Sequence, residues 1–367
     1  MNISIINCFE TYNERVSIIS EYFRLKRHNV TVYTSNFEHS TKKYKLTNDE
    51  NYVYVNSPKY FRNISIKRLY SHYITSKRIF DILYNEKTDI LWVMIPPNSF
   101  VKRARIFKRD FPNIKLIFDV IDMWPETFPI RKSKFFFFTL WRELRDKNIN
   151  YGDIVFSECR LFQSILSKSV SFEKMSTLYL ARRETNEKYN IPILDDKVIS
   201  LCYLGSINNL IDIDEICKIA SSIKSRYKDV CIHIVGDGEK KDIFLYELES
   251  RKIKYYFHGK VYNKDLKTQI FNKCHFGLNI MKKSVFVGLT MKSIDYFEAG
   301  LPIINNIKGD TWDFVNDNYI GYNVTDDNDI YIYDNKMRDS VREFYSNNFT
   351  VNSFSRTLDK SLSKIEV

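Results

Sequence analysis

The feature that most restricts the fold is an alternation of strand-like apolar runs with stretches of helical period, and this alternation occurs twice. In the first half, the runs ISIIN, DILWVMI and KLIFDVID are separated by segments such as RVSIISEYFRLKRH. After residue 196 the pattern begins again with VISLCYLGS, VCIHIVGDG, IKYYFHGKV, HFGLNIM and LPIINNI. Strands joined by crossover helices form parallel sheets. The sequence therefore predicts two doubly wound α/β domains.

A length of 367 residues agrees with two domains, because it exceeds what one hydrophobic core usually holds. Open parallel sheets bind ligands at the carboxyl ends of their strands, so we expect the two domains to face each other across a cleft lined by those ends. Neither half contains the glycine pattern of a dinucleotide site or a P-loop.

The charge and the cysteines restrict the partners and the compartment. A net charge of +11 favours an anionic partner, which is nucleic acid, a phospholipid surface or a phosphorylated small molecule. The six cysteines have no CxxC spacing, so they are predicted to be core residues in a reducing compartment rather than metal ligands. The start, MNISIINCFE, is typical of a first strand and not of a signal peptide.

The stretch GLTMKSIDYFEAGLP, at 288–302, predicts a short helix between two strands, with Thr290 as N-cap and Gly300 after its end. The unpaired N–H groups of its first turn and the charge of Lys292 suit a phosphate or diphosphate. Asp295, one turn further, has the chemistry to bind a ribose diol. The alternative is that the helix dipole favours an acidic residue near this end by about 0.3–1 kcal/mol whatever the helix binds.

Three other strand ends carry glycine. Gly205 follows one strand, Gly238 lies in VGDGE after the next, and Gly259 lies in FHGKV after a third. A glycine there lets the backbone approach a phosphate closely, although a plain turn needs the same residue. Lys260 alone fits a solvated loop lysine equally well.

The segment FDVIDMWPETF in the first half places three carboxylates, Asp119, Asp122 and Glu126, beside Trp124 at a strand end. Carboxylates there are able to position a sugar hydroxyl or to act as a base. The alternative interpretation is that they cap the following turn.

The segment RKSKFFFFTLWRELRDK, at 131–147, surrounds a block of aromatic residues with basic ones. The block is far shorter than the roughly 20 residues that span a bilayer, so it is interpreted either as an interfacial membrane element or as a core helix with a basic face. The membrane- or acceptor-contacting residues predicted here are Arg131, Lys132, Lys134, Phe136, Phe137, Trp141 and Arg142.

In this order, the segments DMWPE, YLGS, IVGDGE, YFHGKV, CHFGLNIM, GLTMKSIDYFEAGLPIINN and GDTWDFV resemble the retaining glycosyltransferases of family 4, especially bacterial enzymes of capsule, O-antigen and exopolysaccharide synthesis. The resemblance covers nearly the whole chain and is more specific in the second half. It implies the GT-B fold, with two Rossmann-like domains around a central cleft. The implied parts are an acceptor domain at 1–190, a nucleotide-sugar domain at 191–345, and a C-terminal helix at 346–367 that crosses back to the first domain.

The resemblance also implies site residues. The ribose ligand of the family falls on Asp295, the diphosphate-holding helix start on 288–292, the glycine loop on Gly205 and Ser206, and the strand end beside the base on 259–261. The predicted donor-binding residues are Gly205, Ser206, Asn208, Asp237, Gly238, Gly259, Lys260, Val261, Gly288, Leu289, Thr290, Met291, Lys292 and Asp295.

This chain departs from the family at two places. The acidic residue that commonly stands eight positions before the ribose ligand is Val287 here, and the basic pair after the glycine loop is replaced by Ile207, Asn208 and Asn209. The resemblance leaves Lys292, Lys282 or Lys283 to supply the missing positive charge.

The expected function is retaining, metal-independent transfer of a sugar from a nucleotide diphosphate sugar to a lipid-linked oligosaccharide, without a cofactor, by a cytoplasmic enzyme peripheral to the inner face of the membrane. Asp122 and Glu126 are predicted to orient the acceptor, and Lys292 to stabilise the leaving diphosphate. The alternatives are a nucleotide-sugar 2-epimerase of the same fold and a non-catalytic partner subunit. Nucleic acid is the weakest candidate partner, because the basic residues belong to no reader motif.

Overall fold

The computed structural model describes residues 1–45, 49–63, 65–127, 136–183, 194, 197–226, 229–325 and 331–367. The chain divides into two compact units. The first unit is Met1–Ala181 together with Val351–Val367, and the second unit is Arg182–Thr350. The breaks therefore fall after residues 181 and 350, and not after 190 and 345 as the sequence suggested. The second break falls after 345 because α11, which runs from Lys336 to Asn348, packs on the second unit through the buried side chains of Met337 and Val341.

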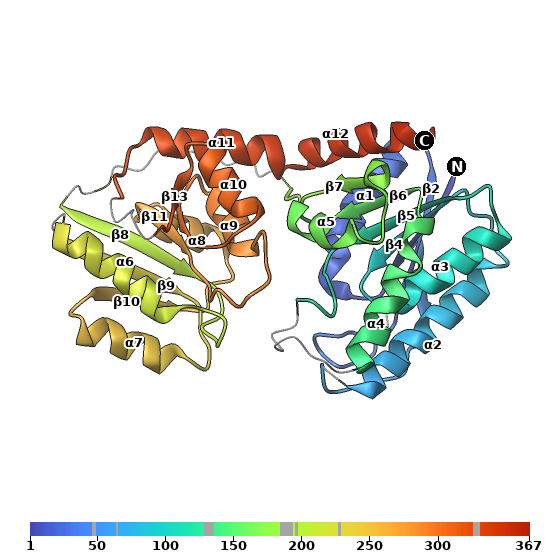
Figure 1. The fold of residues 1–367 in the computed structure, drawn as a ribbon, viewed down its shortest axis with the longest axis horizontal. Coiled ribbons are helices and arrows are strands. Elements are labelled where there is room, and N and C mark those ends of the chain that lie inside the picture. Colours follow the sequence, from blue (N-terminus) through green and yellow to red (C-terminus); the bar gives the residue numbers. More distant parts are fainter. Residues whose placement is uncertain are drawn as a thin grey trace. The chain divides into compact units, whose positions relative to one another are not determined.

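The first unit contains a seven-stranded sheet in the order β3-β2-β1-β4-β5-β6-β7, and all neighbouring strands are parallel. Figure 1 labels β2, β4, β5, β6 and β7 of this sheet, on a ribbon coloured along the sequence. The strands are β1 (Asn2–Asn7), β2 (Asn29–Ser35), β3 (Tyr52–Val55), β4 (Ile90–Ile95), β5 (Lys115–Val120), β6 (Ile154–Ser157) and β7 (Met175–Thr177). The helices are α1 (Asn13–Leu25), α2 (Ile66–Leu83), α3 (Ser99–Asp110), α4 (Phe136–Asp146), α5 (Arg160–Leu166) and α12 (Val351–Leu362).

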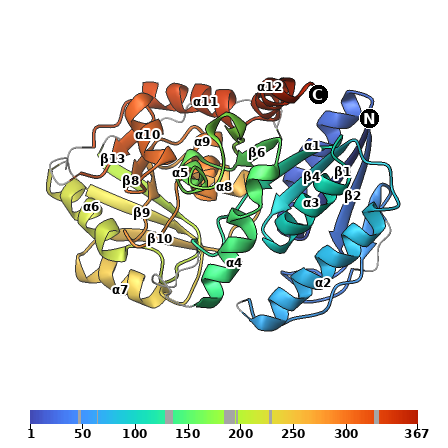
Figure 2. The ribbon, with the colours of Figure 1, turned by 45° about the vertical axis from the view of Figure 1, so that its right-hand side comes forward.

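Two groups of helices cover the first sheet. The connection from β1 through α1 leads to β2 on one side, whereas the connections through α2 to β4 and through α3 to β5 run the opposite way along the sheet. Because such crossovers are right-handed, α1 lies on one face of the sheet and α2 and α3 lie on the other. The C-terminal helix α12 lies against α1, since Phe354, Leu358 and Leu362 belong to the same buried cluster as Ile18. The hydroxyl of Tyr22 donates to Asp359 at 2.7 Å across this contact. Figure 2 shows the helices of this unit from a second direction.

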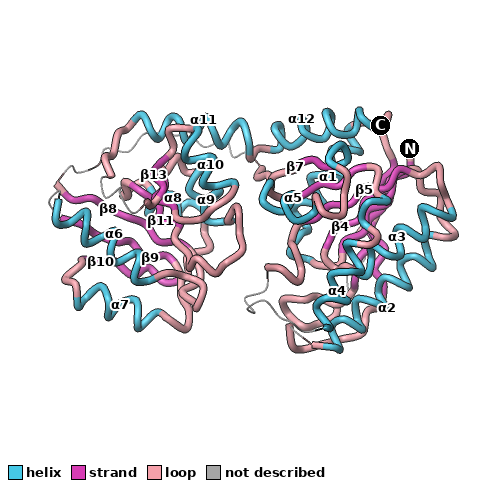
Figure 3. Tube along the Cα trace, in the orientation of Figure 1, coloured by secondary structure: helices cyan, strands magenta, loops and turns pink. Residues whose placement is uncertain are grey.

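The second unit contains a six-stranded parallel sheet in the order β10-β9-β8-β11-β12-β13. Figure 3 shows its strands in magenta with helices on both sides. The strands are β8 (Val198–Leu204), β9 (Asp229–Val235), β10 (Lys254–Gly259), β11 (Phe276–Asn279), β12 (Ile303–Asn305) and β13 (Gly321–Asn323). The helices are α6 (Ile213–Arg226), α7 (Lys241–Ser250), α8 (Lys264–Phe271), α9 (Met291–Glu298), α10 (Asp310–Asp317) and α11 (Lys336–Asn348).

The prediction of two doubly wound α/β domains is confirmed by the two sheets. The inner strands are buried on both faces, as parallel strands between two helical layers must be; β4, for example, is buried over all of Ile90–Ile95. All six cysteines are buried and none forms a disulfide, which agrees with their interpretation as core residues.

Candidate functional site

The three glycine-containing loops of the second unit lie side by side at the carboxyl ends of β8, β9 and β10. The backbone N–H of Gly205 donates to the carbonyl of Val235 at 2.9 Å, and that of Gly236 donates to the carbonyl of Gly259 at 2.8 Å. The N–H of Ile207 donates to the carbonyl of Asp237 at 3.0 Å. The loops predicted to bind the donor therefore form one continuous edge.

The glycines of this edge fall into two kinds. A Cβ on Gly236 would lie 1.9 Å from the carbonyl oxygen of Gly205, and one on Gly238 would lie 2.4 Å from that of Ile207. These two glycines are needed for the loops to pack together, as the turn interpretation of VGDGE proposed. A Cβ on Gly205 or Gly259 would meet nothing within 4 Å. The backbone at Gly205 and Gly259 therefore borders open space that a ligand can approach.

Helix α9 begins and ends as predicted. Thr290 is its N-cap, and the Thr290 hydroxyl oxygen accepts a hydrogen bond from the N–H of Ser293 at 3.2 Å. Gly300 follows the helix with φ of 65°, a left-handed conformation that favours glycine. The cap satisfies Ser293 and leaves the N–H groups of Met291 and Lys292 without an intrahelical acceptor. The start of α9 therefore offers two backbone donors and the positive end of the helix dipole to an anion.

Lys292 extends from this first turn and is half-buried. Its Nζ lies 3.5 Å from the carbonyl oxygen of Ile280 and 5.2 Å from the ring centroid of Tyr203. Burial lowers the pKa of Lys292 to about 7. No described carboxylate forms an ion pair with Lys292, so an incoming anion would supply its missing counter-charge.

Asp295 lies one turn further along α9 and is held between two cations. Its Oδ1 is 3.4 Å from Nη2 of Arg182, and its Oδ2 is 3.4 Å from Nζ of Lys267. The carboxylate is one-fifth exposed, which leaves room for a ligand hydroxyl. The ribose-binding role of Asp295 stays a prediction.

A chain of buried side-chain amides fixes the start of α9 to the sheet. The Thr290 hydroxyl donates to Oδ1 of Asn279 at 2.8 Å, Nδ2 of Asn279 donates to Asn305 at 2.8 Å, and Nδ2 of Asn305 donates to Asn323 at 2.7 Å. These asparagines end β11, β12 and β13. We missed this network in the sequence, although an asparagine at the last position of three neighbouring strands was the signal that could have revealed it.

The remaining predicted donor residues lie in loops of this same unit, apart from Met291, which is the first residue of α9. Asn208 accepts a hydrogen bond from the N–H of Leu210 at 2.9 Å through its side chain and so acts locally as a turn residue. The carbonyl of Gly288 accepts from both the N–H and the hydroxyl of Thr311, at 2.9 and 2.7 Å, which anchors the loop before α9 to α10. The others are partly or fully exposed: Ser206, Asp237, Lys260, Val261, Leu289 and Met291.

Lys282 and Lys283 lie in the loop after β11 and are exposed. The backbone N–H of Lys282 donates to the carbonyl of Leu210 at 2.9 Å, so this loop borders the one that follows Gly205. The two lysines are therefore close to the positions where the basic pair of the resembled family is absent.

In the first unit, the structure corrects the interpretation of Asp119 as a site carboxylate. Asp119 is completely buried, and its two oxygens accept from Nη2 and Nε of Arg15 at 2.8 and 2.9 Å. The indole N–H of Trp92 donates to the same carboxylate at 3.2 Å. Asp119 is thus part of the core beneath the strand ends.

Asp122 and Glu126 are also engaged within the protein. The carboxylate of Asp122 accepts from the indole N–H of Trp124 at 2.5 Å and from the hydroxyl of Thr127 at 2.6 Å, and burial raises its pKa. Both oxygens of Glu126 pair with the guanidinium of buried Arg145, at 3.0 and 2.8 Å. Asp122 therefore stays a candidate for acceptor binding, whereas the geometry gives Glu126 a structural role and does not support its direct contact with an acceptor.

Glu158 is a candidate that we missed in the sequence. It directly follows β6, and its N–H donates to the carbonyl of Val120 at 3.0 Å, so it lies beside the end of β5 from which Asp122 comes. Burial, opposed by Arg15 and assisted by the charges of Asp122 and Asp119, raises the pKa of Glu158 to about 7. Such a carboxyl group can donate or accept a hydrogen bond near neutral pH. A strand-ending glutamate was the only signal in the sequence.

The predicted membrane segment lies only partly within the described residues. Arg131, Lys132 and Lys134, and the side chains of Phe136 and Phe137, lie outside them. Arg142 is exposed on α4, as predicted. Trp141 is only 7% exposed and packs against Trp124 at a centroid distance of 5.8 Å, so it is not an exposed membrane-facing ring. Its contact with an acceptor stays a prediction.

Two doubly wound Rossmann-like units in one chain, with the last helix belonging to the first unit, define the GT-B class of fold. Solved structures with this fold match the whole chain. The lipopolysaccharide outer core galactosyltransferase WaaB in its apo form has a TM-score of 0.71 and 13% identity over 100% of both chains. Anabaena Alr3699/HepE in complex with UDP has a TM-score of 0.69 and 10% identity over 99% of this chain and 100% of that chain.

Sucrose-phosphate synthase from Thermosynechococcus elongatus has a TM-score of 0.67 and 10% identity over 100% of this chain and 99% of that chain. At these identities the likeness establishes the GT-B fold of this chain. Searches with models of known families and among curated proteins gave no match.

Two further properties concern only the described part of the chain. None of its helices is long and apolar enough to cross a bilayer. It also contains no group of three or more histidine, cysteine, aspartate or glutamate side chains placed to hold a metal ion. Metal independence stays a prediction.

Proposed function

We propose that the protein is a glycosyltransferase that transfers a sugar from a nucleotide diphosphate sugar to a lipid-linked oligosaccharide in surface polysaccharide synthesis, with retention of anomeric configuration and without a metal. The observation that carries this proposal is the start of α9, where two unpaired backbone donors and half-buried Lys292 converge beside the loops of a GT-B fold. HepE, which shares the fold, is described in complexes with UDP and with UDP-glucose. The uridine nucleotides are therefore the first donors to test.

The proposed reaction depends on stabilising the negative charge of the leaving nucleotide diphosphate. Departure of the nucleotide diphosphate leaves negative charge on the β-phosphate, and backbone N–H groups at a helix start together with an ammonium group stabilise that charge. A front-face transfer lets the leaving phosphate oxygen take the acceptor proton, so no strong base is required. In the first unit, Asp122 and Glu158 have the chemistry to hold the acceptor hydroxyl.

Nucleotide binding tests the donor half of the proposal. In a thermal-shift panel of nucleotide diphosphates and nucleotide sugars, the cognate ligand at 100 times its Kd should add about 2.7 kcal/mol of stability. Asp295→Ala should weaken its binding by about 1–3 kcal/mol, the range for a hydrogen bond to a charged group. Asp265→Ala, which removes an exposed carboxylate on α8, is the matched control and should bind normally. If no nucleotide stabilises the protein, the proposal fails.

Membrane docking is the second testable part. Exposed apolar side chains of α2 and α4, Ile66, Tyr70, Tyr73 and Leu140, lie on the elements that also expose Lys67 and Arg142. Rings at the headgroup level and cations over anionic lipid would attract this face to a membrane. We expect the protein to sediment with anionic vesicles at low salt and less at high salt, because salt screens the charges.

Replacing Lys132, Lys134 and Arg142 by glutamine should reduce this sedimentation. The matched control replaces three exposed lysines of the second unit, Lys218, Lys252 and Lys254, by glutamine and should sediment like the native protein. Equal sedimentation with neutral and anionic vesicles, or none with either, would show that the acceptor is reached in another way.

A further inference from the structure

A pocket of about 550 Å³ opens among α2, α3 and α4 of the first unit, a size within the range of about 300–1,000 Å³ for small-molecule sites. Aliphatic and aromatic side chains dominate its wall. They are Leu69, Tyr73, Pro97, Leu140, Trp141 and Leu144. Tyr73 and Leu140 are exposed and Trp141 is buried, so the pocket leads from the surface toward the interior. An apolar chain entering it would be removed from water, which favours binding.

The inner wall of this pocket is shared with the candidate acceptor site. The ring of His72, which lines the pocket, stacks on Trp124 at a centroid distance of 6.3 Å, and Trp141 meets the same ring edge-on at 5.8 Å. The indole N–H of Trp124 in turn donates to Asp122. One indole ring therefore separates the pocket from the carboxylate proposed to hold the acceptor sugar.

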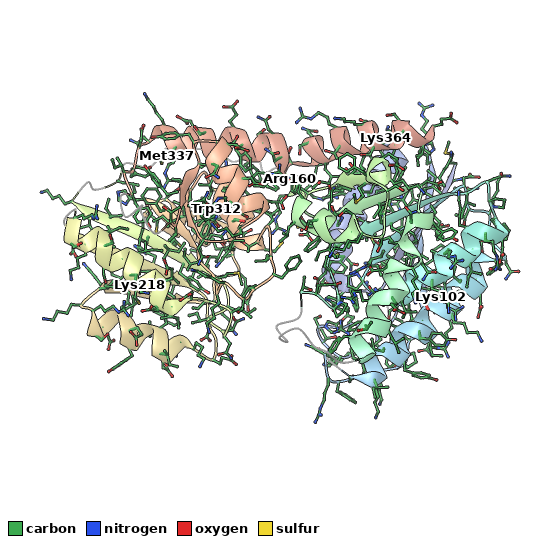
Figure 4. The ribbon with its side chains drawn as sticks, viewed as in Figure 1. Lys102, Arg160, Lys218, Trp312, Met337 and Lys364 are labelled. Atoms are coloured by element: carbon green, nitrogen blue, oxygen red, sulfur yellow. The ribbon has the colours of Figure 1, made fainter. Side chains whose placement is uncertain are left out.

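The polar lining of the pocket includes the cations Lys102, Arg105 and Lys147, and the carboxylate of Glu143 in this lining pairs with Lys147 at 2.7 Å. Lys102, labelled in Figure 4, lines it from the first turn of α3, and no described side chain forms an ion pair with it. The start of α3 contributes little to anion binding, because the N–H groups of Phe100 and Val101 already donate to the carbonyls of Pro97 and Asn98, both at 3.2 Å. An apolar pocket with a cation at its edge matches a molecule with a hydrocarbon chain and a phosphate.

We propose that this pocket holds the hydrocarbon chain of the lipid-linked acceptor, with its phosphate near Lys102, so that the attached sugar reaches the strand ends beside Asp122. This inference rests on the proposed function and names the part of the acceptor that is recognised. The wall shared with Trp124 favours the acceptor lipid over a bulk phospholipid, because only the acceptor must connect the pocket to the sugar site. A single pocket of this size also suits one chain better than the two chains of a bilayer lipid.

Farnesyl phosphate is a short single-chain probe for this site. Titrated calorimetrically into the full chain, it should bind, and farnesol, which lacks the phosphate, should bind at least about tenfold more weakly. Leu69→Gln and Leu144→Gln place an amide in the apolar wall from α2 and α4, and each should weaken binding by about tenfold or more. Lys102→Gln should weaken farnesyl phosphate and leave farnesol unchanged.

Leu25→Gln, a change of an exposed leucine at the end of α1 outside the pocket, is the matched control and should leave binding unchanged. Each variant must keep its nucleotide affinity, which reports a folded second unit, and the native circular dichroism. Equal affinity of all variants for farnesyl phosphate would overturn the inference, as would equally tight binding of monomeric short-chain phosphatidylglycerol. Absence of nucleotide binding would instead refute the proposed function, so the two failures are distinguishable.

Discussion

Replacing Asp119 by alanine should destabilise the first unit by about 3–5 kcal/mol, because it would leave the guanidinium of Arg15 buried without its counter-charge. Both side chains are almost completely buried, at 2% and 0% exposure. Arg15 also donates to the carbonyl of Leu178 at 3.0 Å and lies over the ring of Phe354 in α12, at 5.3 Å from its centroid. The substitution would therefore weaken the contacts that Arg15 makes between α1, β5, the segment after β7 and the C-terminal helix.

A double-mutant cycle measured by chemical denaturation would check this result. The double variant Arg15→Met, Asp119→Leu should be less destabilised than the sum of its single variants, since apolar residues of similar volume can replace a buried ion pair. Lys26→Gln is the control in the same unit. It removes the exposed pair with Asp359 and should cost less than about 1 kcal/mol. A cost for Asp119→Ala as small as that of Lys26→Gln would contradict the role assigned to the buried pair.

Donor affinity should fall by about tenfold for each pH unit above pH 7, and this fall should disappear in Lys292→Arg. The free protein holds the pKa of Lys292 at about 7 through burial, below its usual 10.5, so above pH 7 the lysine is largely neutral. The charged lysine binds the diphosphate more tightly than the neutral one, so binding above pH 7 takes up a proton, and the fall ends where the affinity reaches that of an uncharged side chain. Below pH 7 the lysine is already charged, and the affinity should be nearly constant.

The two histidines near the donor-binding loops do not cause this dependence of donor affinity on pH. His233 and His258, on β9 and β10, have pKa values lowered by burial, so they are already neutral above pH 7. A nucleotide sugar is the proper ligand, because the terminal phosphate of a free nucleotide diphosphate ionises itself, near pH 6.

Calorimetry between pH 6 and pH 9 checks the prediction. Lys292→Arg keeps its charge throughout this range and should give a flat curve. Lys292→Met should also be flat but weaker than the native protein at pH 6 by about 1–3 kcal/mol. A flat curve for the native protein would show that Lys292 does not neutralise the diphosphate.

The sequence alone determined the architecture and the candidate donor helix, because both depend on local signals. The alternation of strand and helix periods predicted two parallel α/β sheets. The cap residue Thr290 and the glycine at 300 located α9 within a residue. These signals act over one or two turns of backbone and need no knowledge of distant contacts.

Only the tertiary structure decided what individual polar residues do. The sequence showed three carboxylates near one strand end. It did not show that Arg15, 104 residues away, neutralises Asp119, or that Arg145 occupies both oxygens of Glu126. The sequence also did not show that Trp141 is buried, with its ring packed against Trp124. The pairing of a charge and the burial of a ring depend on which distant segments fold against them, and hydrophobic period and spacing carry no information about those partners.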